Sequence, residues 1–319
     1  MNKIISEILQ KLNISNNIGI ISHIRPDGDT VGSGVALYLM CKKLGKNAEL
    51  FCEDPVMEKL LFISDADKYQ NKLDAKKFDC LVAIDCGDLG RLGSLQYEFL
   101  SCQNTINIDH HINSNASYAK INLVLNYAAT AEIIYEIIKV SGVETDKEIA
   151  TALYTAISTD TGNFQHNSTN KHTFECAKNL VEHIGDVNKI CDVLYRGTSV
   201  SRFKLLGDVL NSAHFFEDNK IVILAVTFDK LNKSNSNIFE TEGFVDHAIN
   251  VIGCEVGICM TQTKERLFKV SFRSKGTVDV FKIANVFGGG GHKFAAACQI
   301  CGDLYEILDK LVREVQFYL

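Results

Sequence analysis

The sequence predicts an α/β protein: a larger domain with a mostly parallel sheet and flanking helices, then a linker helix, then a smaller α+β domain. Short apolar runs of strand length recur at residues 18–22, 48–52, 80–84 and 105–108, and a helix-like segment at 31–43 separates the first two. Alternating strands and helices are typical of a parallel sheet with helices on its faces. The length of 319 residues allows two domains of ordinary size.

Helices dominate the chain after the fourth apolar run. Residues 128–140, 146–158, 171–183 and 187–195 carry apolar side chains three and four positions apart, which indicates helices with one buried face. Residues 199–211 predict a further helix, which we expect to connect the two domains.

The second domain mixes strands and helices. Strands are predicted at 221–226, 255–260 and 267–272, and helices at 242–251, 280–287 and 304–319. We therefore expect a first domain at residues 1–190, a helical linker at 191–212 and a second domain at 213–319.

The composition argues against several classes of protein. The formal net charge of −6 disfavours tight binding to long nucleic acids, because such binding needs many basic side chains. No apolar stretch reaches the roughly 18 residues of a membrane span, and the N-terminus lacks the features of a signal peptide, so we expect a cytoplasmic protein with no membrane partner. The 11 cysteines are odd in number and many lie in apolar runs, which favours reduced, buried thiols.

The sequence contains four short clusters of acidic residues and histidines. Segments 23–29, 85–88 and 109–111 each follow an apolar run directly, and Asp160 lies just beyond the predicted helix 146–158. Because ligands of open α/β sheets bind at the carboxyl ends of the strands, we expect these side chains to share one crevice. Carboxylates gathered there repel one another unless a cation lies among them, and the simplest solution is a pair of divalent metal ions.

Six residues are the candidate metal ligands: His23, Asp27, Asp29, Asp85, His110 and Asp160. Oxygen and nitrogen ligands without thiolate favour Mn²⁺, Mg²⁺ or Fe²⁺ over a structural zinc ion, and the imidazoles favour Mn²⁺ among these. Asp85 stands alone at its strand end and is the natural bridge between two ions. Taken singly, each cluster is explained as well by an ordinary turn, a helix end or a surface pair, but three clusters at equivalent strand ends are not.

These clusters carry a resemblance to a known family. The segments H-I-R-P-D-G-D (23–29), A-I-D-C-G-D (83–88), I-D-H-H (108–111) and S-T-D-T-G (158–162) resemble the four motifs of the DHH phosphoesterase superfamily. In the second domain, V-S-F-R-S-K (270–275) and G-G-G-G-H-K-F-A-A-A (288–297) are similar to the DHH-associated C-terminal domain. The resemblance covers nearly the whole chain, and the two-domain layout is similar to that of the nanoRNase/pAp phosphatase group, also called bifunctional oligoribonucleases.

The resemblance implies a role for each residue of the clusters. His23 and Asp27 would bind one metal ion, Asp29, His110 and Asp160 the other, and Asp85 both. The implied cofactors are two Mn²⁺ ions, with Mg²⁺ or another divalent ion as alternatives.

Three residues have implied catalytic roles. Asp85 would bridge the ions, Asp109 would orient a neighbouring histidine, and His111 would face the scissile phosphate as a hydrogen-bond donor or proton source for the leaving oxygen. The nucleophile would be a metal-bridging hydroxide, so no side-chain nucleophile is required.

The second domain offers candidate substrate-binding residues. They are Arg273, Gly289, Gly290, Gly291 and His292. A run of glycines leaves backbone N–H groups open to a phosphate, and an arginine on a strand can make bidentate bonds to one. A flexible loop and a solvated arginine are the alternative interpretations, but the neighbouring S-F-R-S and A-A-A segments favour substrate binding.

The expected function is that of a Mn²⁺-dependent phosphohydrolase. It would degrade very short single-stranded RNA or DNA, and linear dinucleotides such as pApA and pGpG, to mononucleotides. It would also dephosphorylate 3′,5′-bisphosphate adenosine (pAp) to AMP. A long duplex would not fit a cleft between two small domains, and a homodimer is left open. The alternatives are a DHH-type inorganic pyrophosphatase, a RecJ-type single-strand exonuclease and, outside enzymes, a nucleotide-sensing binding module.

Overall fold

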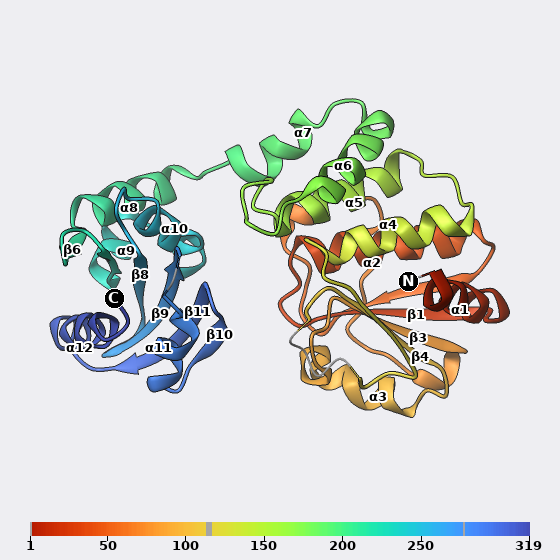
Figure 1. The fold of residues 1–319 in the computed structure, drawn as a ribbon, viewed down its shortest axis with the longest axis horizontal. Helices are drawn as coiled ribbons and strands as arrows, with labels where there is room; N and C mark the ends of the chain where they lie inside the picture. The colour runs from red at the N-terminus through yellow and green to blue at the C-terminus, as the bar shows by residue number, and fades with distance from the viewer. Residues whose placement is uncertain (1, 113–116, 277) are drawn as a thin grey trace. The chain divides into compact units, whose positions relative to one another are not determined.

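The chain divides into two compact units in a computed structural model, which describes residues 2–112, 117–276 and 278–319 (Figure 1). The first unit is Met1–Gly197 and the second is Thr198–Leu319. Among the described residues, no helix combines the length and apolarity that a membrane crossing requires.

The first unit is built on a five-stranded sheet in which every pair of neighbours is parallel. In spatial order the strands are β2 (Asn47–Phe51), β1 (Asn17–Ser22), β3 (Cys80–Ile84), β4 (Thr105–Asp109) and β5 (Ile121–Val124). This sheet confirms the predicted fold class. The sequence did not predict β5, because its four residues lie at the sheet edge and most are only half-buried, which leaves no continuous apolar run.

Helices cover both faces of this sheet. Alternate strand residues such as Ile18 and Ile20 pack against one set of helices, whereas Ile21 packs with Phe99 of α3 on the opposite face. The helices are α1 (Asn2–Ile14), α2 (Gly28–Lys43), α3 (Gln96–Ser101), α4 (Thr130–Ser141), α5 (Lys147–Asp160), α6 (Lys171–Ile184) and α7 (Asn188–Cys191). A π-helical turn, Asp192–Arg196, follows α7. Short 3₁₀ turns lie at Glu58–Leu60, Ala66–Lys68, Ala75–Lys77 and Leu89–Leu95.

Helix α2 begins three residues earlier than the sequence predicts. The Asp27 side chain accepts hydrogen bonds from the backbone N–H groups of Asp29 and Thr30 and so caps the helix. Further along α2, a Cβ atom on Gly32 would lie only 2.3 Å from the Ala152 carbonyl oxygen of α5. The glycine therefore allows a close approach of the two helices that carry Asp29 and Asp160.

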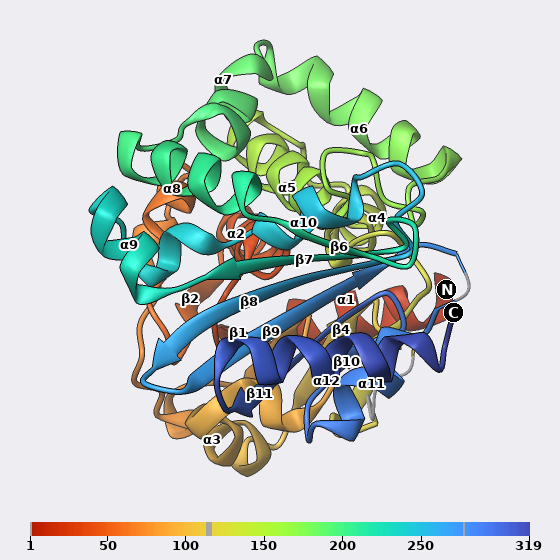
Figure 2. The same cartoon turned by 90° about the vertical axis from the view of Figure 1, so that its left-hand side faces the viewer.

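The second unit contains a six-stranded mixed sheet (Figure 2). In spatial order its strands are β10 (Gly290–His292), β11 (Ala295–Cys301), β9 (Leu267–Ser274), β8 (Val256–Lys264), β7 (Ile221–Val226) and β6 (His214–Phe216). Among the described strands of this second sheet, only β7 and β8 pair in parallel. One face packs on α11 (Val280–Val286) and α12 (Leu304–Gln316). The other packs on α8 (Val200–Asn211), α9 (Phe228–Ser234) and α10 (Phe244–Ile249), near a 3₁₀ turn at Ile238–Thr241.

The predicted linker helix is part of this second unit. Leu205 and Val209 of α8 are fully buried in the core that also contains Val222 and Phe244. The helix is therefore packed against the sheet and does not stand alone between the units.

Candidate metal centre

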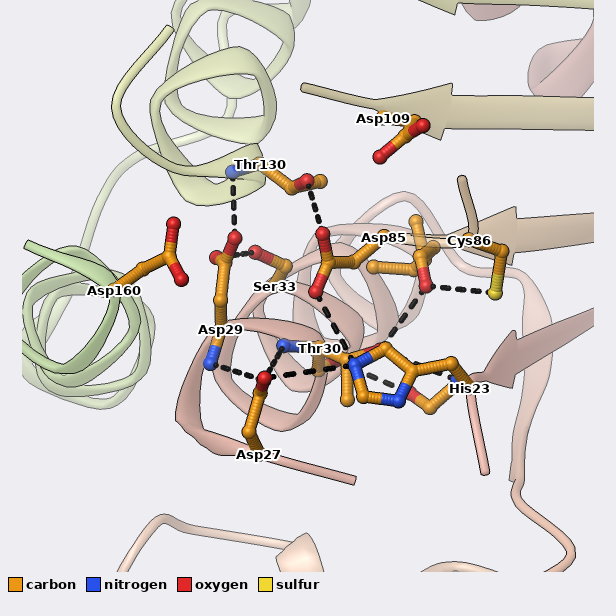
Figure 3. A network of polar contacts seen from close by, with 12 residues as sticks. His23, Asp27, Asp29, Thr30, Ser33, Asp85, Cys86, Asp109, Thr130 and Asp160 are labelled. Carbon is orange, nitrogen blue, oxygen red and sulfur yellow. Dashed lines mark hydrogen bonds and ion pairs between the residues drawn. The ribbon is translucent and has the colours of Figure 1, made fainter. Parts of the chain in front are cut away.

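The candidate ligands of the first unit converge at the carboxyl edge of the sheet. Figure 3 shows five of them: His23, Asp27, Asp29, Asp85 and Asp160. His23, Asp85 and His110 follow β1, β3 and β4 directly, whereas Asp27 caps α2, Asp29 lies in its first turn and Asp160 is the last residue of α5. We call these six residues the metal centre. Two groups have ligand atoms within 4.8 Å of one another, one of His23, Asp27 and Asp85 and one of Asp29, His110 and Asp160. A third group of this kind, Asp85, His110 and His111, shares a residue with each of them.

His23 lies against two carboxylates. Its Nε2 atom is 3.6 Å from Asp27 Oδ2 and 3.4 Å from Asp85 Oδ2. The Nδ1 atom lies 2.7 Å from the Ile24 carbonyl oxygen, which can only accept, so Nδ1 carries a proton. The buried Nε2 atom has no hydrogen-bond partner among the described residues. An imidazole lone pair facing two carboxylates fits a cation between them.

His110 occupies a second, similar position. Its Nε2 atom is 3.4 Å from Asp160 Oδ2, 3.6 Å from Asp85 Oδ1 and 4.0 Å from Asp29 Oδ2. Its Nδ1–H donates to the Tyr127 carbonyl oxygen at 3.1 Å, which again directs Nε2 toward the acids. The same geometry therefore occurs twice, once around each histidine.

Asp85 lies between the two histidines. One carboxylate oxygen faces His23 and the other faces His110. The residue has a left-handed backbone, with φ of 60°, which is unusual for a residue other than glycine. Its N–H donates to the Ile108 carbonyl oxygen at 2.9 Å, and its Oδ1 atom accepts from the Thr130 hydroxyl at 3.0 Å. These bonds hold the carboxylate with Oδ2 toward His23 and Oδ1 toward His110.

Asp29 is held by helix α4 and by its own helix. Its carboxylate is fully buried and accepts hydrogen bonds from Thr130 N at 2.7 Å, Ala131 N at 3.1 Å and the Ser33 hydroxyl at 2.9 Å. The two amides are the first of α4, where the helix dipole favours an anion. The sequence analysis did not identify Thr130 or Ser33. The Ser33 contact could have been predicted from the sequence, because Ser33 lies one helical turn after Asp29.

Burial and the neighbouring charges shift the pKa values of several of these groups. Burial lowers the pKa of His23, but Asp27 and Asp85 outweigh burial and raise it to about 10. Burial likewise lowers the pKa of His110, and the three facing carboxylates raise it to about 9. Burial, with repulsion from Asp85, raises the pKa of Asp160 to about 7. Cations bound among these groups would displace the protons.

Asp109 and His111 form a separate pair beside the metal centre. The His111 Nδ1–H donates to Asp109 Oδ1 at 2.7 Å, and the same oxygen accepts from the His111 backbone N–H at 3.2 Å. Asp109 is fully buried, whereas the His111 side chain is 30% exposed. Burial lowers the pKa of His111, and Asp109 and Asp85 raise it above its usual range. The buried carboxylate therefore fixes the orientation of an accessible imidazole.

The candidate substrate residues of the second unit make local contacts. Arg273 Nε lies 3.2 Å from Asp246 Oδ1 of α10. We expected open backbone N–H groups along the glycine run, but this is wrong for Gly288 and Gly289, which donate to carbonyl oxygens of α11. Gly290 to His292 form strand β10 rather than a loop. The His292 side chain lies outside the described part of the structure.

The fold and the paired acid–histidine groups define a phosphoesterase of the DHH class. Residues 17–157 match the DHH family N-terminal domain and residues 217–316 match the DHHA1 domain. The chain is 31% identical to the bifunctional oligoribonuclease and PAP phosphatase NrnA of Thermus thermophilus over 317 residues, which are 98% of this chain and 93% of that protein. The chain therefore belongs to the DHH family and is a phosphoesterase.

Two further proteins are similar to this chain over most of its length. The protein of the same name from Bacillus subtilis is 23% identical over 298 residues, which cover 92% of this chain and 93% of that one. A crystal structure of an exopolyphosphatase-related protein from Bacteroides fragilis superposes with a TM-score of 0.94 at 23% identity and covers 100% of this chain and 97% of that one. This last similarity bears on the fold alone.

Proposed function

We propose that the protein is a Mn²⁺-dependent phosphohydrolase that cleaves very short oligonucleotides to mononucleotides and dephosphorylates pAp to AMP. The observation that carries the chemistry is the position of Asp85, whose two carboxylate oxygens face two separate imidazoles. The names of the relatives from Thermus thermophilus and Bacillus subtilis support the choice of substrates. A cytoplasmic location and a homodimer belong to the same proposal.

Two divalent ions fit the residues of the metal centre. His23 and Asp27 would hold one ion, His110, Asp29 and Asp160 the other, and Asp85 both. Such a pair supplies positive charge that lowers the pKa of a water molecule and offsets the charge that develops on the phosphate. The unpartnered Nε2 atom of His23, buried against two carboxylates, supports this assignment.

His111 and Asp109 would act on the leaving group. With Nδ1–H held by Asp109, the opposite ring atom, Nε2, can donate a proton to the leaving oxygen as the phosphorus–oxygen bond breaks. The Asp109 carboxylate stabilises the protonated imidazole and fixes its orientation.

Arg273 and the exposed part of the glycine run would hold a second phosphate of the substrate. The Arg273 guanidinium is 38% exposed, so its contact with Asp246 is a surface ion pair of small energy that a phosphate can replace. Gly290 has open space where a side chain would lie, which allows an anion to approach its backbone. A substrate with two phosphates, such as pAp or pApA, would offer one phosphate to these groups.

Comparing rates on four substrates tests this proposal. The purified protein with Mn²⁺ would be given pAp, pApA, pyrophosphate and 5′-labelled RNA ranging from the dinucleotide to long oligomers. We expect hydrolysis of pAp and the dinucleotide to be fastest, with rates falling as the RNA lengthens. Faster hydrolysis of pyrophosphate would identify a pyrophosphatase, and undiminished rates on long RNA would identify an exonuclease of RecJ type. Metal-dependent binding without hydrolysis would identify a nucleotide sensor.

A further inference from the structure

A second group of ligand-type side chains lies between α4 and α6, outside the metal centre. It consists of Glu132 in α4 and of His172 and Cys176 in α6. His172 and Cys176 are four positions apart and therefore lie on one face of their helix. The His172 Nε2 atom is 3.6 Å from Cys176 Sγ and 3.8 Å from Glu132 Oε2. One imidazole nitrogen thus faces a thiol from its own helix and a carboxylate from another.

The Glu132 carboxylate is the least satisfied member of this group. Its side chain is fully buried, and neither oxygen has a hydrogen bond of normal geometry to any residue that the structure describes. Burial raises its pKa, while the nearby Thr173 hydroxyl and His172 lower it by less. A buried carboxylate without a donor is destabilising unless a proton or a cation compensates its charge.

A cavity opens beside the group. It has a volume of about 210 Å³, and His172 and Cys176 contribute to its wall. Two further carboxylates, Glu136 and Glu175, and two lysines, Lys139 and Lys178, also line it. An ion can therefore reach His172 from this side, and a water molecule or one of these carboxylates can complete its coordination.

We propose that Glu132, His172 and Cys176 form a binding site for a divalent transition-metal ion such as Zn²⁺, separate from the metal centre. A set of one thiolate, one imidazole and one carboxylate suits zinc, unlike the sulfur-free ligands of the metal centre. Zinc bonds of about 2.1 Å to nitrogen and about 2.3 Å to sulfur place those atoms about 3.6 Å apart in a tetrahedral site. The His172–Cys176 pair already has this spacing.

Binding requires side-chain movements, because the ligand atoms of the three residues do not all lie within 4.8 Å of one another. A tetrahedral zinc ion places its nitrogen and oxygen ligands about 3.4 Å apart, so Glu132 must approach His172 by a few tenths of an ångström, and the thiol and carboxylate must both turn toward the ion. Burial raises the pKa of the Cys176 thiol, which therefore keeps its proton until the metal displaces it. The ion would then join α4 to α6.

Cobalt absorption separates this site from the metal centre. A Co²⁺–thiolate bond gives a charge-transfer band in the near ultraviolet, and the six ligands of the metal centre include no sulfur. We expect the band when Co²⁺ alone is added to the full chain, and we expect Asp85→Asn to retain it. Cys176→Ser and His172→Asn should abolish it. Cys86→Ser, which removes a buried thiol next to Asp85, is the matched control and should retain it.

Three results would overturn the proposal. They are the absence of the band at saturating Co²⁺, its persistence in Cys176→Ser, and an unchanged Co²⁺ affinity in Glu132→Gln. The last variant keeps the thiol and the shape of the site, so we expect it to bind Co²⁺ at least tenfold more weakly. Circular dichroism melting of each variant would confirm that it is folded. These outcomes do not depend on hydrolysis of any substrate.

Discussion

The metal centre of the first unit and the glycine segment of the second, residues 288–291, satisfy their polar groups in opposite ways. In the metal centre, carboxylates and imidazoles face one another across 3.4–3.6 Å, longer than ordinary hydrogen bonds. In the glycine segment, backbone groups pair with α11 and β11, and Arg273 pairs with Asp246 at the surface. The charged groups of the first region therefore leave places for cations among them, whereas the polar groups of the second are already paired within the unit.

The largest expected effect comes from removing the shared carboxylate. Asp85→Asn keeps the shape of the side chain but removes the charge between the two histidines, so activity in Mn²⁺ should fall about a thousandfold or more. Steady-state rates on pAp would measure it. Asp74 is an exposed acidic residue outside the metal centre, so Asp74→Asn is the control for the loss of one negative charge. Retained activity in Asp85→Asn would contradict the bridging role.

The next expected effect falls on the leaving-group pair. His111→Asn should lower kcat about 10²–10³-fold because the proton donor is lost, while Mn²⁺ affinity changes much less. Measuring kcat and Mn²⁺ binding on the same preparation separates a loss of catalysis from a loss of metal binding. An equally large loss of metal affinity would make His111 a metal ligand.

Metal affinity should depend steeply on pH. His23, with a pKa of about 10, and His110, with a pKa of about 9, are both protonated at neutral pH without metal, and both must lose a proton to bind an ion. Affinity should therefore rise with pH, by roughly tenfold or more for each unit around neutrality. Calorimetric titration with Mn²⁺ in buffers of different ionisation enthalpy would count the protons released. A pH-independent affinity would show that these histidines are not ligands.

Arg273 should affect substrate binding more than catalysis. Arg273→Ala removes a bidentate phosphate contact and should raise KM for pAp about tenfold with a much smaller change in kcat. Lys269→Ala removes an exposed positive charge from the same strand and serves as the control. If KM is unchanged, Arg273 does not contact the substrate.

The smallest expected effects distinguish two neighbouring glycines. A Cβ atom on Gly289 would lie 2.2 Å from the Ala297 carbonyl oxygen, whereas one on Gly290 meets nothing within 4 Å. Gly289→Ala should therefore lower the free energy of unfolding by about 1–3 kcal/mol, and Gly290→Ala should leave it nearly unchanged. Urea unfolding of the two variants would measure this. If Gly290→Ala raises KM without loss of stability, the backbone of Gly290 contacts the substrate. Equal free energies of unfolding for the two variants would contradict the close packing at Gly289.

More of the arrangement of the metal centre than of the glycine segment could be predicted from the sequence. His23, Asp85 and His110 follow apolar strand runs, and parallel strand ends necessarily share one edge of the sheet, so local patterns were enough to bring them together. Thr130 escaped prediction because its bond to Asp29 joins residues 101 positions apart. Such a contact depends on the path of the whole chain.

The glycine segment shows why the remainder could not be predicted. Glycines lack the side chains that distinguish a strand from a loop, so nothing local indicated that Gly290 would pair with Ala297. The small edge strands β5 and β10 both escaped prediction, since neither carries a long apolar run. Pairing with a neighbouring strand, rather than intrinsic preference, determines both.

Anomalous diffraction at the manganese edge, from crystals grown with Mn²⁺, tests the central claim most directly. The account predicts two peaks about 3.5–4 Å apart, with Asp85 between them and His23 and His110 on separate ions. A single peak, or two peaks that do not share Asp85, would contradict it.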